Sequence, residues 1–112
     1  MHRTANKLLR SKEWDSFTNI IYGFSTTLNY TSPSNENNII NFAKKLKALG
    51  AIYQVQQVHG NKVVDIEAFP NDKLPEADAL VTNKTNSILA VKTADCVSIL
   101  LYDKVNKVIA AV

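Results

Sequence analysis

The sequence predicts an α+β protein with a mixed or antiparallel sheet and one main packing helix. Three observations lead to this class: a strand-like run near residue 20, an amphipathic stretch at about 34–49, and several short apolar runs after it. This order lacks the regular strand–helix alternation of a doubly wound α/β fold. With 46% hydrophobic and 21% charged residues, the 112-residue chain has the composition of a globular domain with a single core.

The beginning of the chain carries the weakest structural signal. Residues 1–19 are expected to form a weakly structured segment, and residues 20–112 the folded domain. NIIYGFST, at 19–26, predicts the first strand because branched and aromatic residues favour extended backbone. The following stretch is rich in Ser, Pro and Asn, which are typical of turns.

The main helix is predicted at about 34–49. Ser34 is a suitable N-cap, Glu36 favours the first turn, and Gly50 is the expected residue just beyond the helix end. Apolar residues recur at spacings of three and four, which is the period of a helix with one buried face: Ile39, Phe42, Leu46 and Leu49. We expect this helix to pack against a core and to carry no functional site.

Short strands are expected to make up the rest of the chain. AIYQVQQV (51–58) and KVVDIEAF (62–69) flank His59-Gly60-Asn61, and a Gly-Asn pair between two apolar runs predicts a β-hairpin. Four further runs predict strands: ALVT, SILAVKT, VSILLYD and KVIAAV. The last of these opens a strand with no turn after it, which suggests a domain cut short.

Composition argues against several classes of protein. No run approaches the ~20 apolar residues of a membrane-spanning helix, and the first ten residues are polar and basic without a signal-peptide core. The net charge is +3, but the lysines are scattered and form no basic stripe with aromatic residues, so nucleic-acid binding is not expected. A single cysteine fits a reducing compartment. We therefore expect a cytoplasmic protein without a membrane or nucleic-acid partner.

Two residues stand out chemically. Cys96 is the only cysteine and follows Asp95 at the start of an apolar strand, and His59 lies at the end of another. Each has an ordinary structural interpretation: a free cysteine usually packs as a small hydrophobe, and a hairpin-end histidine often bonds a backbone carbonyl. However, an acid such as Asp95 must stay solvated or paired, which places the thiol at the mouth of its strand. Gly60 beside His59 allows a ligand or a neighbouring backbone to approach closely.

Together these residues are compatible with two chemistries. His59 could deprotonate Cys96 for nucleophilic attack in a metal-free hydrolase, or both could bind zinc or copper, which accept nitrogen and sulfur donors. A catalytic zinc needs about three protein ligands, so a third would have to come from elsewhere. Asp78 is either a solvated turn residue or a group that orients a ligand near the sheet edge.

Four motifs, in order, resemble the multicopper polyphenol oxidase (laccase) domain family with its YfiH-like purine nucleoside phosphorylases: GFST, QVHG, ADALVT and TADCVSILLYD. The resemblance covers about residues 22–112 and implies that the chain is the N-terminal part of an incomplete YfiH-like domain. It implies metal ligation by His59 and Cys96, with Asp78 and Asp95 orienting ligands. A second histidine, in an H-A-G-W-R-G motif that the chain lacks, would complete the site.

The same resemblance implies phosphorolysis of adenosine, inosine or methylthioadenosine, with adenosine deamination as a side activity. The partners would be a purine nucleoside, phosphate, and a separate C-terminal segment supplying the missing histidine. Thr27 stands where the family has an arginine, which leaves the substrate-binding residues open. Two alternatives remain: a truncated or split product without a complete site, and the metal-free Cys-His hydrolase.

Overall fold

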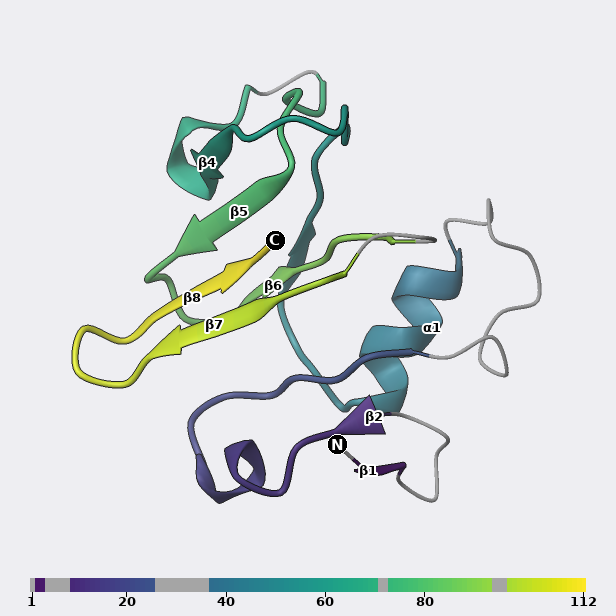
Figure 1. Ribbon diagram of the computed structural model, residues 1–112, viewed down its shortest axis with the longest axis vertical. Helices are drawn as coiled ribbons and strands as arrows, with labels where there is room; N and C mark the ends of the chain where they lie inside the picture. Colours follow the sequence, from purple (N-terminus) through teal and green to yellow (C-terminus); the bar gives the residue numbers. More distant parts are fainter. Residues whose placement is uncertain (1, 4–8, 26–36, 71–72, 94–96) are drawn as a thin grey trace. The chain divides into compact units, whose positions relative to one another are not determined.

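The computed structural model describes residues 2–3, 9–25, 37–70, 73–93 and 97–112. The chain divides into two units, residues 1–49 and 50–112. Figure 1 shows their elements, and each unit is described by itself. The predicted division into 1–19 and 20–112 stays a prediction.

The first unit opens with two short strands and a single 3-10 turn. Strand β1 (His2–Arg3) pairs antiparallel with β2 (Leu9–Arg10), and η1 spans Trp14–Ser16. The strand predicted at 19–26 is wrong for the described residues 19–25, where only Phe24 forms an isolated bridge. These residues contribute through a buried side chain instead of a strand ladder.

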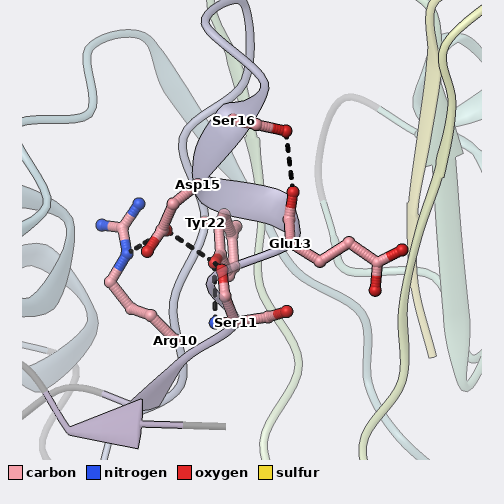
Figure 2. Close-up of polar contacts among 6 residues, drawn as sticks. All are labelled: Arg10, Ser11, Glu13, Asp15, Ser16 and Tyr22. Atoms are coloured by element: carbon pink, nitrogen blue, oxygen red, sulfur yellow. Dashed lines mark hydrogen bonds and ion pairs between the residues drawn. The ribbon is translucent and has the colours of Figure 1, made fainter.

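That side chain is Tyr22, which is only 7% exposed. Its hydroxyl accepts from the backbone N–H of Ser11 and lies within donating distance of two acceptors for its one proton, the carbonyl of Ser11 and the carboxylate of Asp15, as Figure 2 shows. Arg10 places its guanidinium 4.7 Å from the centre of the Tyr22 ring and donates to Asp15 at 3.0 Å. Burial, followed by the bond to Asp15, raises the pKa of Tyr22. The side chain of Tyr22 therefore joins the segment that begins at Arg10 through hydrogen bonds and a cation–π contact.

The predicted helix is confirmed in type but is shorter than expected. Helix α1 spans Asn37–Lys45, and the proposed cap residues 34–36 lie outside the described residues. It ends early because Lys47 adopts a left-handed φ of 58°. The N–H of Lys47 bonds the carbonyl of Lys44 at 3.0 Å and that of Ala48 bonds Ala43 at 3.0 Å, which is the Schellman ending. Lys47, not Gly50, therefore follows the helix end, and Leu49 is left 82% exposed.

The second unit begins with a parallel pair. Strand β3 (Ala51–Tyr53) pairs with β6 (Ser87–Leu89), with Tyr53 opposite Leu89. Gly50, at φ 125°, precedes β3 where a Cβ atom would lie 1.9 Å from the carbonyl oxygen of Asn86. The glycine predicted as a helix stop therefore allows two backbones to meet at the start of this pair.

A four-stranded sheet in the order β4-β5-β8-β7 completes the unit (Figure 1). Strand β4 (Val63–Asp65) runs parallel to β5 (Ala79–Thr82), while β8 (Val108–Ala111) runs antiparallel to both β5 and β7 (Leu100–Asp103). The 3-10 turn η3 (Ile66–Ala68) follows β4 directly. This arrangement confirms the α+β class with a mixed sheet.

The predicted hairpin across His59-Gly60-Asn61 is wrong. The two runs that should form it pair with distant strands instead, β3 with β6 and β4 with β5. The physical reason is that each run finds a parallel neighbour in the sheet, and the backbone N–H groups of residues 58–60 bind a side chain from outside the turn.

One face of the four-stranded sheet forms the core of the unit. Leu80 is fully buried and is the centre of a cluster with Val55, Val64, Ile66 and Ala77. Thr82 is also buried, at 2% exposure, and its hydroxyl accepts the N–H of Lys84 at 3.0 Å. This core holds β4 and β5 together, and with them the loops that precede these two strands.

Candidate functional site

The parallel pairing of β4 and β5 determines which loops lie close together. Segments that precede two parallel strands lie at the same end of the sheet, so residues 56–62 lie beside residues 75–78. Three backbone hydrogen bonds confirm this: the N–H of Gln56 bonds Pro75 and that of Ala77 bonds Gln56, which together form the parallel bridge of Gln56 with Glu76, and that of Asp78 bonds Lys62. The QVHG and ADAL motifs therefore meet at one edge.

The carboxylate of Asp78 organises the loop that carries His59. Its Oδ1 accepts the backbone N–H groups of Val58 and His59, both at 3.0 Å, and its Oδ2 accepts that of Gly60 at 2.7 Å. These bonds, led by the one from Gly60, lower the pKa of Asp78. His59 takes a left-handed backbone, with φ 61°, within this turn. Asp78 therefore controls the backbone of the loop and makes no hydrogen bond to the histidine ring.

Gly60 is the closest loop residue to the Asp78 carboxylate. A Cβ atom at this position would lie 3.4 Å from the Oδ2 atom of Asp78 and 3.8 Å from a Val58 methyl group. Both distances are ordinary van der Waals contacts, so a Cβ atom would fit beside the carboxylate. The group that approaches this glycine is thus the protein's own Asp78.

The imidazole of His59 is exposed. Within the ranges that the structure describes, no hydrogen bond reaches this ring, so the alternative of a carbonyl-bound structural histidine finds no support there. An exposed imidazole whose backbone is held by three neighbouring bonds to one carboxylate is suited to donate a nitrogen lone pair to a metal or to accept a proton.

Gln57, the first residue of QVHG, has a role that the sequence analysis missed. Its side-chain amide donates to the carbonyl of Lys92 at 2.7 Å, and its Oε1 accepts the N–H of Lys92 at 2.8 Å. The side-chain amide thus makes the same pair of hydrogen bonds that a neighbouring strand's backbone would make. We call this pair of bonds, which joins two segments 35 positions apart, the clamp. Lys92 comes four residues before Cys96 in the sequence, so the clamp holds the QVHG segment beside the residue from which that stretch begins. The only signal in the sequence was the glutamine's place two residues before His59.

Other predicted site residues lie outside the described residues. Cys96 and Asp95 belong to 94–96, and Thr27 belongs to 26–36. In the described part of the chain, no group of three or more His, Cys, Asp or Glu side chains is placed to hold a metal ion. The ligand pair of His59 and Cys96, and the ligand-orienting roles of Asp78 and Asp95, stay predictions. The donor chemistry of an exposed imidazole and a thiolate fits zinc or copper.

An open groove of about 740 Å³ lies along β4 and the segment that precedes β5. Its lining carries both charge signs together with apolar side chains and includes Gln56, Lys62, Asp65, Lys73, Leu74 and Glu76. Neither His59 nor Asp78 lines it, although Gln56 and Lys62, at the two ends of the histidine loop, do.

The fold and this loop define a class: an α+β domain that presents one imidazole on a carboxylate-held loop at the edge of a mixed sheet. Comparison with protein families identifies the particular group. The chain belongs to the multi-copper polyphenol oxidoreductase laccase family, whose model matches residues 25–112. By its description this family is a metal-binding one.

Individual relatives carry the name purine nucleoside phosphorylase. The chain is 43% identical over 58 residues to one from Clostridium acetobutylicum, covering 52% of this chain and 24% of the relative. It is 35% identical over 88 residues to one from Rickettsia conorii, covering 73% of this chain and 36% of the relative. One from Rickettsia prowazekii is 34% identical over 97 residues, covering 77% and 40%. The chain therefore spans between about a quarter and two fifths of the length of these relatives.

No helix within the described ranges has the length and apolar character that a membrane crossing requires.

Proposed function

We propose that this chain contributes the histidine-cysteine part of a metal-dependent purine nucleoside phosphorylase. The observation that carries the proposal is the match, at 34–43% identity, to relatives that bear this name. The substrates would be phosphate and adenosine, inosine or methylthioadenosine, with adenosine deamination as a side activity. The site would operate in the cytoplasm, where a lone cysteine stays reduced.

In this proposal His59 and Cys96 hold zinc, with copper as the alternative metal. A bound zinc would supply a water molecule of lowered pKa for the deamination. The chain's own residues prepare the site: Asp78 holds the His59 loop through three backbone bonds, and Gln57 keeps that loop beside the segment entering Cys96. Asp95 would orient a ligand or keep the strand mouth polar. The substrate-binding residues are left open, because Thr27 stands where the family has an arginine.

A third donor would come from polypeptide outside this sequence, in the H-A-G-W-R-G motif of the family. The matched relatives are long enough to contain such a segment, since this chain spans at most 40% of the length of the three compared above. On this view the chain alone holds two of three donors and is inactive by itself.

The test combines the 112-residue chain with a separately made segment that carries H-A-G-W-R-G. We expect about one zinc per complex by metal analysis, and release of hypoxanthine from inosine only when phosphate is present. The variant His59→Ala should lose the zinc, while His2→Ala, which removes the only other histidine, should keep it. Absence of metal uptake by a clean mixture would refute the proposal and leave the non-catalytic alternative.

Alkylation of the thiol gives a readout independent of activity. Bound zinc should protect Cys96 from iodoacetamide, and the protection should be absent in His59→Ala. Rapid alkylation at pH 6 that zinc does not change would instead indicate the metal-free Cys-His pair, because it requires a thiol of depressed pKa.

A further inference from the structure

The four-stranded sheet of the second unit has two faces, and both are apolar. Cross-strand register places Val64, Leu80, Ala111 and Leu100 in one row on the core face. Strand alternation turns the neighbouring residues to the opposite side. We call that side the open face, and it consists of Val63, Asp65, Ala79, Val81, Ile99, Leu101, Asp103, Val108, Ala110 and Val112.

The composition of the open face differs from that of a sheet surface turned to water. Antiparallel sheets with one solvated side alternate apolar and polar residues, whereas this face has two polar members, Asp65 in β4 and Asp103 at the end of β7. Four of its apolar side chains are exposed, Val63 by 60%, Leu101 by 54%, Ile99 by 47% and Val112 by 39%, whereas Val81 is half-buried and Ala79 is buried. Contiguous apolar surface of this kind marks a site where another protein surface packs.

The lengths of the relatives indicate what covers it. In the three relatives compared above, the matched segment is only 24–40% of the protein, so most of the family's chain lies outside it. If part of this remaining polypeptide packed onto the open face, both apolar faces of the mixed sheet would be buried, as in a layered domain. A second copy of this chain is the competing occupant.

We infer that the open face is the docking surface for the remainder of the family domain, a stretch of polypeptide that packs an apolar layer onto β4, β5, β8 and β7. The inference takes the identity of this polypeptide from the proposed function. It concerns assembly and not chemistry, so the two can fail separately.

The test is coexpression of the tagged chain with the untagged part of the Rickettsia prowazekii relative that the chain does not match. We expect a one-to-one complex that copurifies and sediments as a heterodimer. Leu101→Lys places a charge in the buried interface and should weaken association by at least about tenfold. Val105→Lys is the matched control, because Val105 is 80% exposed in the turn after β7 and lies off the open face, and it should change affinity by less than about twofold.

A second measurement covers the case in which the remainder does not fold. The chain alone should bind the dye anilinonaphthalene sulfonate, and Leu101→Lys should reduce the fluorescence more than Val105→Lys does. Circular dichroism melts of both variants should match the parent. Equal effects of the two substitutions, no dye binding, or a homodimer of the chain that Leu101→Lys dissociates would each overturn the inference. A heterodimer that takes up no zinc would uphold the docking surface and refute the proposed function.

Discussion

The side chain of Gln57 offers the sharpest test of how the candidate site is held together. Its amide exchanges two hydrogen bonds with the backbone of Lys92, at 2.7 and 2.8 Å, across 35 positions of sequence. Gln57→Leu preserves the size of the side chain and removes both bonds. The segment that leads to Cys96 then loses this attachment to the segment that carries His59.

The expected cost follows from the number and setting of these bonds. A neutral hydrogen bond contributes about 0.5–1.5 kcal/mol net, and water partly replaces bonds near the surface, so the two together should contribute about 1–2 kcal/mol. Urea denaturation at pH 7 should show this loss in the free energy of unfolding. Hydrogen exchange gives the local readout: the Lys92 amide should exchange up to about tenfold faster, because 1.4 kcal/mol corresponds to a factor of ten.

Two further variants separate the clamp from a general surface effect. Gln56→Leu introduces the same apolar side chain at the exposed neighbouring position and should leave the Lys92 amide unchanged. Gln57→Glu keeps an acceptor for the N–H of Lys92 but turns a carboxylate oxygen toward its carbonyl, so it should rescue only the exchange protection and not the stability. If Gln57→Leu and Gln56→Leu accelerate exchange at Lys92 equally, the clamp has no role.

Three other predictions concern the loop, the backbone and the core. Asp78→Asn should lower the urea midpoint at pH 7. The backbone bonds lower the pKa of this carboxyl in the folded state, so the carboxylate stabilises the fold at pH values above its ordinary pKa of 3.8. The difference in stability between the two proteins should therefore shrink as the pH falls below that value. Gly50→Ala should lower the free energy of unfolding by more than about 2 kcal/mol in urea melts, because residue 50 has a φ of 125° and the added Cβ would collide with the carbonyl of Asn86. A change below about 0.5 kcal/mol would contradict that geometry. Leu80→Ala should cost about 2–5 kcal/mol and lower the thermal midpoint, whereas a neutral effect would show that the core lies elsewhere.

Patterns within a few residues predicted the local elements well. The run ALVT coincides with β5 (Ala79–Thr82), and the three-four spacing of apolar residues located α1. The end of α1 was misplaced because a lysine, Lys47, takes the left-handed backbone that is usually assigned to glycine. Local propensity therefore identified the kind of element better than its boundary.

Long-range pairing was the part that the sequence could not reveal. Gly60-Asn61 carries a hairpin signal, yet β3 pairs with β6, 36 residues on, and β4 pairs with β5, 16 residues on, and no local pattern identifies such partners. The site shows the same limit. The position of Asp78 before a strand suggested that it orients something polar, but only the parallel register shows that its carboxylate binds the backbone of residues 58–60.

The strand connections of the second unit also have a consequence for the order of folding. β7 and β8 are joined by the short turn 104–107, in which Asp103 accepts the N–H groups of Val105 and Asn106, so this hairpin can close in about 1–10 μs. The parallel pairs must first close much longer loops, and the Gln57–Lys92 clamp is among the last contacts that can form. Substitutions in β7 and β8 should therefore slow folding, whereas substitutions in the clamp should chiefly accelerate unfolding. The segments that carry the candidate site are thus expected to separate early in unfolding, while the β7–β8 hairpin is still paired.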